Sequence, residues 1–143
     1  MISTVEKVLF LKSIDLFSQI PGEDLARLAQ IAEECDFDPT EIIMSEGELG
    51  DSMYLIVEGK VDVIKGKRSV VELGDRECVG EMAILDSEPR SATVQAKTPV
   101  RALRIEREDF YELMREKIEI AQGIIQVLTR RLRSTTAQHD ASV

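Results

Sequence analysis

Residues 79–94 (VGEMAILDSEPRSATV) combine the residue types that a phosphate-binding site needs. Gly80 precedes a short apolar run of helical length, and a glycine there lets a ligand approach the backbone because no Cβ intervenes. The first N–H groups of a helix lack intrahelical partners and lie at the positive end of its dipole, which suits an anion. Arg90 follows the break after that run, where its guanidinium can reach the same anion in a charge-assisted contact. Glu81 fits beside a phosphate only if it accepts a hydrogen bond from a ligand hydroxyl.

Each of these side chains also has a purely structural interpretation. Arg90 could instead pair with Asp86 or Glu88 within the loop. Glu81 could stabilise the N-terminus of the helix, a role that is compatible with hydroxyl binding. The hydroxyl of Ser91 could reach a phosphate or a guanine amino group, or could serve the turn alone. Ser91 therefore does not decide between adenine and guanine.

The same residues give this stretch a resemblance to a known family. VGEMAIL…PRSATV resembles the phosphate-binding cassette of cyclic nucleotide-binding domains, whose usual form is F-G-E-(L/M)-A-L-(L/I)-x-x-x-P-R-x-A. The resemblance implies that Glu81 binds the ribose 2′-hydroxyl and that Arg90 pairs with the cyclic phosphate. It also implies further ligand contacts at the start of the helix and at the closing side of the site, from Gly80, Met82, Ala83, Ser91 and Ala92.

A second pattern of this family, G-x-x-I-x-x-x-G-x-x-x-x-x-x-Y-x-I-x-x-G-x-V, precedes the cassette. Its matching positions are Ile43, Gly47, Tyr54, Ile56, Gly59 and Val61. Two turn positions where the family usually has glycine hold Thr40 and Arg76 instead. Val79 replaces the usual phenylalanine, so a smaller apolar contact is expected between the cassette and the helices. None of the three differences touches the predicted ligand contacts.

The hydrophobic period changes along the chain and predicts the order of the elements. Residues 1–34 carry two helical patterns, the second of which starts at Pro21 and ends near Glu34. Residues 35–106 alternate in short segments between turns, which predicts strands, and the cassette at residues 79–92 interrupts them. Many short strands joined by tight turns predict an α+β fold built on a β-barrel or jelly roll, that is, a double-stranded β-helix.

Residues 107–133 form the predicted C-terminal helices, and a polar tail at residues 134–143 follows them. The helical pattern has two apolar stripes, one with Phe110, Met114, Ala121, Ile125, Leu128 and Leu132 and one with Ile120, Ile124 and Val127. A helix that is apolar on two faces must bury both. One face can pack on the barrel, while the other would meet a ligand base, a partner helix or both; simple core packing of both faces is the alternative.

Gly123 marks a bend within this segment or a boundary between two helices. The resemblance implies that the last helix closes over the base of the nucleotide as a lid. The candidate base contacts are apolar residues of the strand before the cassette and of the last helix: Val71, Leu73, Ile124, Val127 and Leu128.

Length, charge and composition limit the classes of function. A chain of 143 residues is long enough for one domain with a core. Its net charge of −9 argues against non-specific nucleic-acid binding, and the basic run at residues 130–133 is interpreted as cations near a helix C-terminus. The single histidine, His139, lies in the tail, so neither a Ser-His-Asp triad nor a histidine-rich metal site is expected.

The remaining composition is that of a soluble domain. Cys35 and Cys78 are far apart in sequence and lack metal-ligand spacing, so we expect reduced thiols, with oxidation sensing at Cys78 as the alternative. No apolar run approaches the roughly 20 residues that cross a bilayer, and the N-terminus lacks the pattern of a signal peptide. We therefore expect a cytoplasmic module, either free-standing or cut from a larger and membrane-associated protein.

Two hypotheses of different class follow. The first is a regulatory domain that binds cAMP or cGMP, needs no cofactor, and transmits movement of the last helix to an attached or partner effector. The second is a module of the same fold that binds no ligand and acts in docking or in homodimerisation through the two-faced helix. In neither hypothesis does this chain itself bind nucleic acid or a membrane, and in neither is it an enzyme.

Overall fold

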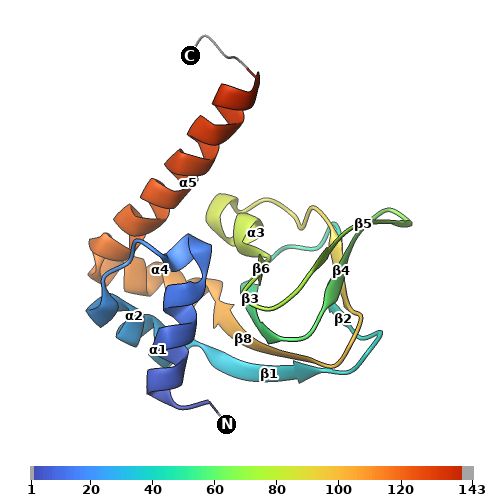
Figure 1. The fold of residues 1–143 in the computed structure, drawn as a ribbon, viewed down its shortest axis with the longest axis horizontal. Coiled ribbons are helices and arrows are strands. Elements are labelled where there is room, and N and C mark those ends of the chain that lie inside the picture. The colour runs from blue at the N-terminus through green and yellow to red at the C-terminus, as the bar shows by residue number, and fades with distance from the viewer. Residues whose placement is uncertain (1, 140–143) are drawn as a thin grey trace.

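The computed structural model describes residues 2–139, with side chains up to residue 135 (Figure 1). Helix α1 (Thr4–Ser13) begins with a capping box in which Ser3 and Glu6 satisfy each other's backbone N–H groups. A 3₁₀ turn, η1 (Asp15–Phe17), leads to α2 (Gly22–Ile31). Pro21 is the N-cap of α2 rather than its first helical residue. The predicted end near Glu34 is wrong by about one turn, because that part of the chain pairs as a strand.

In the described part of the chain, eight strands form two antiparallel four-stranded sheets, which is the jelly-roll form of the predicted fold and not a closed barrel. One sheet has the order β1-β8-β3-β6, and the other has the order β2-β7-β4-β5. The strands are β1 (Glu33–Phe37), β2 (Ile42–Met44), β3 (Ser52–Glu58), β4 (Val61–Lys65), β5 (Arg68–Leu73), β6 (Cys78–Val79), β7 (Thr93–Ala96) and β8 (Val100–Glu106). The two-residue β6 ends at the glycine of the cassette, so its pairing with β3 fixes where the cassette begins.

The sheet containing β3 and β8 separates two hydrophobic cores. Alternate residues of β3 point to opposite faces, as the pleat requires. Met53 and Leu55 pack with the helices, whereas Ile56 packs between the two sheets. The helical core includes side chains from η1, α2 and both C-terminal helices, and it covers the outer face of this sheet (Figure 1). The helices and the core between the two sheets thus share the sheet β1-β8-β3-β6.

The C-terminal helices are α4 (Arg107–Glu116) and α5 (Ile118–His139), and they meet at Lys117. The boundary predicted at Gly123 is therefore wrong. Gly123 lies inside α5, where a Cβ atom would come within 2.9 Å of the carbonyl oxygen of Gln19, so the glycine permits close packing of α5 on the N-terminal segment. Helix α5 also continues six residues beyond the predicted end at Arg133, and the rest of the predicted tail lies outside the described residues.

The two apolar stripes of the C-terminal segment differ in how far they are buried. Ile120, Ile124 and Val127 are buried in the helical core. In the other stripe, Ile125 and Leu132 are 60% and 66% exposed within the described chain, so the alternative of simple core packing of both faces is wrong, and coverage of this face by a ligand base or a partner helix stays a prediction. The end of α5 projects from the body of the molecule (Figure 1), because only its first half has core residues against which to pack.

The two turn positions where the family pattern usually has glycine keep a left-handed backbone. Thr40 has a φ of 73° and Arg76 a φ of 70°. The turn geometry is thus retained without glycine, the residue that adopts a left-handed backbone most easily. The steric strain of the side chains lowers the stability of the fold. None of the helices in the described part of the chain is long and apolar enough to cross a membrane.

Candidate nucleotide-binding site

The cassette folds as a strand end, a left-handed glycine and a short helix. Gly80, with a φ of 86°, is the N-cap of α3 (Glu81–Asp86). A Cβ atom at this position would overlap the Nη1 atom of Arg90 and would lie 2.9 Å from the terminal methyl of Met44. Glycine is therefore required twice at position 80, once for the backbone conformation and once for the close approach of the arginine.

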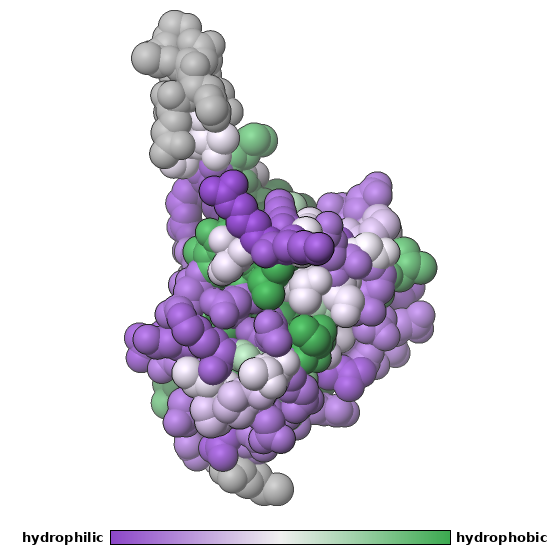
Figure 2. Space-filling model, turned by 90° about the vertical axis from the view of Figure 1, so that its right-hand side faces the viewer, coloured by the Kyte–Doolittle hydropathy of each residue, from purple (hydrophilic) through white to green (hydrophobic). Residues whose placement is uncertain are grey.

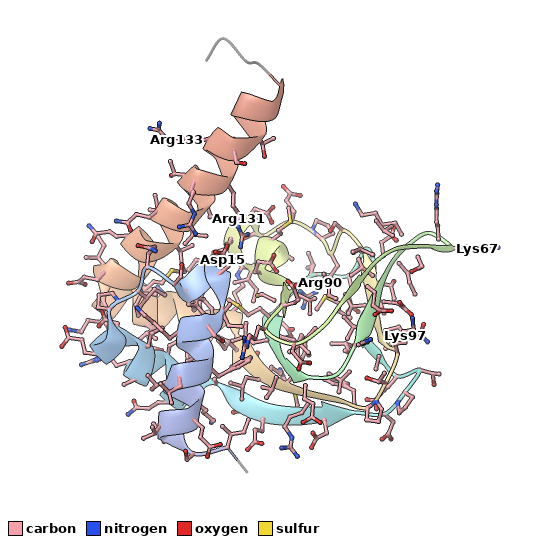
Figure 3. The ribbon with its side chains drawn as sticks, in the orientation of Figure 1. Asp15, Lys67, Arg90, Lys97, Arg131 and Arg133 are labelled. Atoms are coloured by element: carbon pink, nitrogen blue, oxygen red, sulfur yellow. The ribbon has the colours of Figure 1, made fainter. Side chains whose placement is uncertain are left out.

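Arg90 is the central charged group of this region. Its side chain is only 6% exposed. The Nη2 atom of Arg90 (labelled in Figure 3) donates to the carbonyl oxygen of Ser52 at 2.7 Å, and Nη1 donates to that of Gly80 at 3.2 Å, while Nε is buried without a partner among the described residues. Within the described residues no carboxylate forms an ion pair with Arg90. A buried cation with spare donors and no counter-charge suits an anionic ligand.

The structural alternative for Arg90, pairing with Asp86 or Glu88, is not observed. Asp86 accepts from the backbone N–H of Glu88 instead. The backbone on either side of the arginine is also held, because the N–H of Arg90 donates to the carbonyl of Glu48 and the carbonyl of Arg90 accepts from the N–H of Gly47. The loop that contains residues 47 and 48 therefore fixes the position from which the guanidinium extends.

Gly50 forms the other side of the space that Arg90 occupies. A Cβ atom on Gly50 would lie 2.7 Å from the Cβ of Ala83 and 2.9 Å from the Cζ of Arg90. The sequence analysis missed both Gly50 and Ser52. The glycine-bearing loop after β2 was a signal for the first of them, but Ser52 contributes a backbone oxygen, which any residue type could supply.

Glu81, the first residue of α3, is partly buried. Burial raises the pKa of its carboxyl group, whereas hydrogen bonds from its own backbone and from the Cys78 thiol, together with the charges of Arg131 and Arg90, act in the opposite direction. Burial likewise raises the pKa of Cys78 well above the ordinary thiol value, so the sulfur stays protonated and can donate to the carboxylate. Glu81 thus places in the cavity lining a carboxyl group that can accept hydrogen bonds.

A cavity of about 150 Å³ lies between α3 and the sandwich. All seven predicted ligand-binding residues line it, namely Gly80, Glu81, Met82, Ala83, Arg90, Ser91 and Ala92. The other lining residues are Met44, Val63, Leu73, Cys78, Val79 and Val94. The volume is below the roughly 300–1,000 Å³ of most small-molecule pockets. It suits a sugar phosphate, and a base attached to the sugar would have to extend along the outer surface.

The predicted base contacts divide into three groups. Leu73 lines the cavity. Val71 and Leu128 lie outside its lining and are 46% and 37% exposed. Ile124 and Val127 are 3% and 0% exposed because they pack in the helical core, so they do not face the cavity in this arrangement of α5, and their contact with a base stays a prediction. Figure 2, viewed from the side of β5, shows apolar areas in an otherwise mostly hydrophilic surface.

The C-terminal end of α3 is tied to α4. The hydroxyl of Tyr111 donates to the carbonyl of Ile84 at 2.6 Å and lies 3.3 Å from that of Leu85. Arg107 stacks on the Tyr111 ring, with its Cζ 5.3 Å from the ring centre, and also hydrogen-bonds the Ser87 hydroxyl. These contacts connect the cavity wall to the C-terminal helices, even though Val79 is smaller than the phenylalanine that is usual behind the cassette.

Comparisons with known proteins agree with this arrangement. The sequence profile of the family described as "Cyclic nucleotide-binding domain" matches residues 34–117. A CRP-like cAMP-activated global transcriptional regulator from Mycobacterium tuberculosis is 30% identical over 125 residues, which are 84% of this chain and 56% of that protein.

Two solved structures extend the comparison. The N-terminal domain of a transcriptional regulator from Streptomyces coelicolor is 27% identical, with a TM-score of 0.83 over 92% of this chain and 95% of that one. The regulatory subunit of a cAMP-independent protein kinase A from Trypanosoma brucei, a mutant bound to cAMP in its A site, is 28% identical, with a TM-score of 0.77 over 90% of this chain and 46% of that one.

The chain thus spans about half the length of the Mycobacterium regulator and of the Trypanosoma subunit. The predicted fold class, helices on a jelly-roll β-structure, is confirmed, with two sheets in place of a closed barrel. The family profile covers the whole stretch from β1 to the end of α4, including the cassette and the arginine in its buried cradle. This chain belongs to the cyclic nucleotide-binding domain family.

Proposed function

We propose that this chain is a regulatory domain that binds a 3′,5′-cyclic nucleotide, cAMP or cGMP, in the cavity beside α3. The proposal rests on Arg90, which lines the cavity and is 94% buried. Among the described residues, its Nε has no hydrogen-bond partner and its guanidinium has no carboxylate partner. A singly charged cyclic phosphate supplies one counter-charge and acceptors for the donors of Arg90.

Glu81 gives the proposal its second contact. A ribose attached to the phosphate places hydroxyl groups within the cavity, and the carboxylate of Glu81 can accept from one of them. We define the phosphate end as Gly80 and Arg90, which line the cavity, together with Gly50 and Ser52, which contact Arg90. We define the base end as Leu73, which lines the cavity, together with the two exposed predicted base contacts, Val71 on the same strand and Leu128 on α5.

In this proposal the role of the domain is regulatory and not catalytic. Residues 1–34 and 107–133 are the parts that would transmit ligand binding, and residues 35–106 hold the ligand. A ligand shifts the position of the helices only by as much as its affinity for the two arrangements differs. Tyr111 is a direct route for that coupling, since it joins the last carbonyls of α3 to α4. Cyclic nucleotides are intracellular messengers, so the proposal places the domain in the cytoplasm.

Calorimetry with cAMP and with cGMP tests the proposal. We expect saturable heat with at least one of them, and we expect Arg90→Ala to lose about 2–5 kcal/mol of binding free energy because the buried phosphate would be unpaired. Arg101→Ala is the matched control, since Arg101 is exposed on β8 and pairs with Asp36 at the surface. Arg90→Lys keeps a charge but not the planar guanidinium, and should bind with intermediate affinity. No heat with either nucleotide would exclude the proposal.

A second candidate function rests on the exposed stripe of α5. Ile125, Leu128 and Leu132 follow one another at helical spacing on the part of the helix that leaves the body. Exposed apolar residues in this pattern favour a helix-to-helix contact between two copies of the chain. Sedimentation of the chain and of Leu132→Glu, each with and without cyclic nucleotide, tests this candidate. A monomer under all conditions would exclude it.

A further inference from the structure

The methionines of this chain differ widely in their exposure to solvent. Met82, the second residue of α3, is 63% exposed. Met53 and Met44 are buried, with 0% and 4% of their surfaces exposed, and Met114 is half-buried against the helical core. Among the described methionines, Met82 is therefore the one most accessible to a solute.

The two cysteines are poor targets for an oxidant. Burial raises the pKa of Cys35 to about 11 and that of Cys78 well above the ordinary thiol value. Peroxides react with the thiolate rather than with the thiol, so both cysteines react slowly at neutral pH. The thioether of a methionine has no proton to lose, and its reaction with a peroxide does not depend on such an ionisation.

Met82 also forms part of the nucleotide cavity. It lines the cavity beside Glu81 and Ala83, its two neighbours in α3. Most of the other lining side chains are apolar, among them Val63 and Leu73. A nucleotide bound in the cavity would cover part of Met82, and a change in the polarity of Met82 would alter a surface that the nucleotide meets.

We propose that Met82 is an oxidation site for peroxides, and that its conversion to the sulfoxide weakens nucleotide binding in the cavity. The effect on binding rests on the proposed function. In the reaction with hydrogen peroxide, a lone pair of the sulfur attacks one peroxide oxygen, and an S–O bond forms as the O–O bond breaks. The proton of the attacked oxygen passes to the other oxygen, which leaves as water. The sulfur loses two electrons and the peroxide gains them.

The product differs from methionine in the properties that matter for this ligand. Oxidation converts a flexible apolar side chain into a polar one. The sulfoxide oxygen accepts hydrogen bonds but cannot donate them, and the phosphate oxygens of a cyclic nucleotide also only accept. Oxidised Met82 thus removes an apolar contact from the cavity without offering the phosphate a donor.

Mass spectrometry of peptides after brief exposure to hydrogen peroxide measures the rate of oxidation at each methionine. We expect Met82 to react faster than Met114, and Met44 and Met53 to react most slowly. Saturating cAMP or cGMP should slow the reaction of Met82. It should not slow that of Met114, which is not among the residues that line the cavity. Equal rates at Met82 and Met114 in the free protein, or no protection of Met82 by a nucleotide that binds, would overturn the proposal.

Calorimetry with cAMP and cGMP before and after peroxide treatment measures the effect on binding. The affinity of the wild-type protein should fall about two- to fivefold, the size of one lost apolar contact. Methionine sulfoxide reductases of both types, one for each sulfoxide epimer, should restore it. Met82→Leu has an apolar side chain of similar volume that peroxide does not oxidise, so its own affinity should be the same before and after treatment.

Met114→Leu is the matched control, and its affinity should fall on peroxide treatment as that of the wild-type protein does. An equal fall in Met82→Leu would assign the effect to another side chain and overturn the proposal. If neither nucleotide gives heat before oxidation, the proposed function fails, and the effect on binding fails with it. If a nucleotide binds and complete oxidation of Met82 leaves its affinity unchanged, the role of Met82 fails alone.

Discussion

The two ends of the cavity are built in different ways. The phosphate end consists of a buried arginine, two backbone carbonyls and two glycines that leave it space, and each of its polar contacts is a hydrogen bond of 2.7–3.2 Å. The base end consists of Leu73 and of Val71 and Leu128, which are 46% and 37% exposed. The first is fixed by the sandwich, whereas the second depends on where α5 lies.

This difference indicates how binding energy is divided. Groups that are rigid and desolvated before the ligand arrives contribute strongly per contact, because no ordering cost is left to pay. Apolar residues that are half exposed contribute only in proportion to the area that the ligand covers. We therefore expect the phosphate end to determine affinity and the base end to adjust it. Four substitutions test this comparison, in order of decreasing expected effect.

Gly80→Ala should be the most damaging change at the phosphate end. The added Cβ would overlap Nη1 of Arg90, and the left-handed backbone costs about 1–2 kcal/mol for a residue with a side chain. Displacement of Arg90 should bring the loss of nucleotide affinity close to that of Arg90→Ala, about 2–5 kcal/mol by calorimetry. Gly66→Ala is the control, because Gly66 is also left-handed (φ 64°) but has open space around it. Equal affinity losses in the two variants would contradict the prediction.

Glu81→Ala tests the contact between the two ends. Loss of a charged hydrogen bond to the sugar should cost about 1.5–3 kcal/mol of binding free energy. A 2′-deoxy cyclic nucleotide should bind the wild-type protein as weakly as it binds Glu81→Ala, and calorimetry with both ligands measures this. Glu88→Ala is the control, since Glu88 is exposed in the loop after α3. Full-strength binding of the 2′-deoxy ligand to the wild-type protein would refute the pairing.

Leu73→Ala tests the base end. Leu73 is the one predicted base contact that lines the cavity, and its truncation should reduce affinity by about 1 kcal/mol through lost apolar contact. Val70→Ala, on the same strand but 56% exposed and away from the cavity, should leave affinity unchanged. A loss from Leu73→Ala as large as that from Gly80→Ala would reverse the comparison between the two ends.

Thr40→Gly tests the strain of a turn that belongs to neither end of the cavity. Thr40 holds a φ of 73°, which a β-branched residue adopts only at a cost. Glycine should stabilise the fold by about 0.5–1 kcal/mol, the relief of strain being partly offset by the greater freedom of glycine in the unfolded chain. Urea denaturation measures this gain, and nucleotide affinity should not change. Thr40→Ala keeps a Cβ and should bring little of the gain; an equal gain from alanine would contradict the strain argument.

The cassette could be predicted from the sequence because its contacts are local. Gly80, Glu81, Arg90 and their neighbours lie within one short segment, and all seven predicted ligand contacts line one cavity. Gly50 and Ser52 could not be predicted in the same way. They meet Arg90 across 38 or more residues of chain, and Ser52 does so through a backbone carbonyl that its residue type does not reveal.

The errors in the helices have a single physical origin. Periodicity shows which residues share a face, but it does not show which face meets the core and which remains exposed. Ile124 and Val127 fit the base as well as the core by sequence, and packing of α5 through Gly123 on the segment after η1 places them in the core. The boundary at Lys117 and the exposure of Ile125 and Leu132 follow from the same docking of α5.

The sequence by itself predicted the residue types of the candidate site: a glycine, an acid and an arginine at spacings that bring them to one cavity. Gly80 and Glu81 follow from the local backbone of a short segment, whereas Arg90 reaches the cavity from a position that the loop at residues 47 and 48 holds. Only the tertiary structure decided which side chains surround Arg90 and Glu81 from outside the cassette, and where α5 lies. Those arrangements depend on contacts between segments far apart in the chain, such as Asp15 with Arg131, whose energies arise only once both cores are packed.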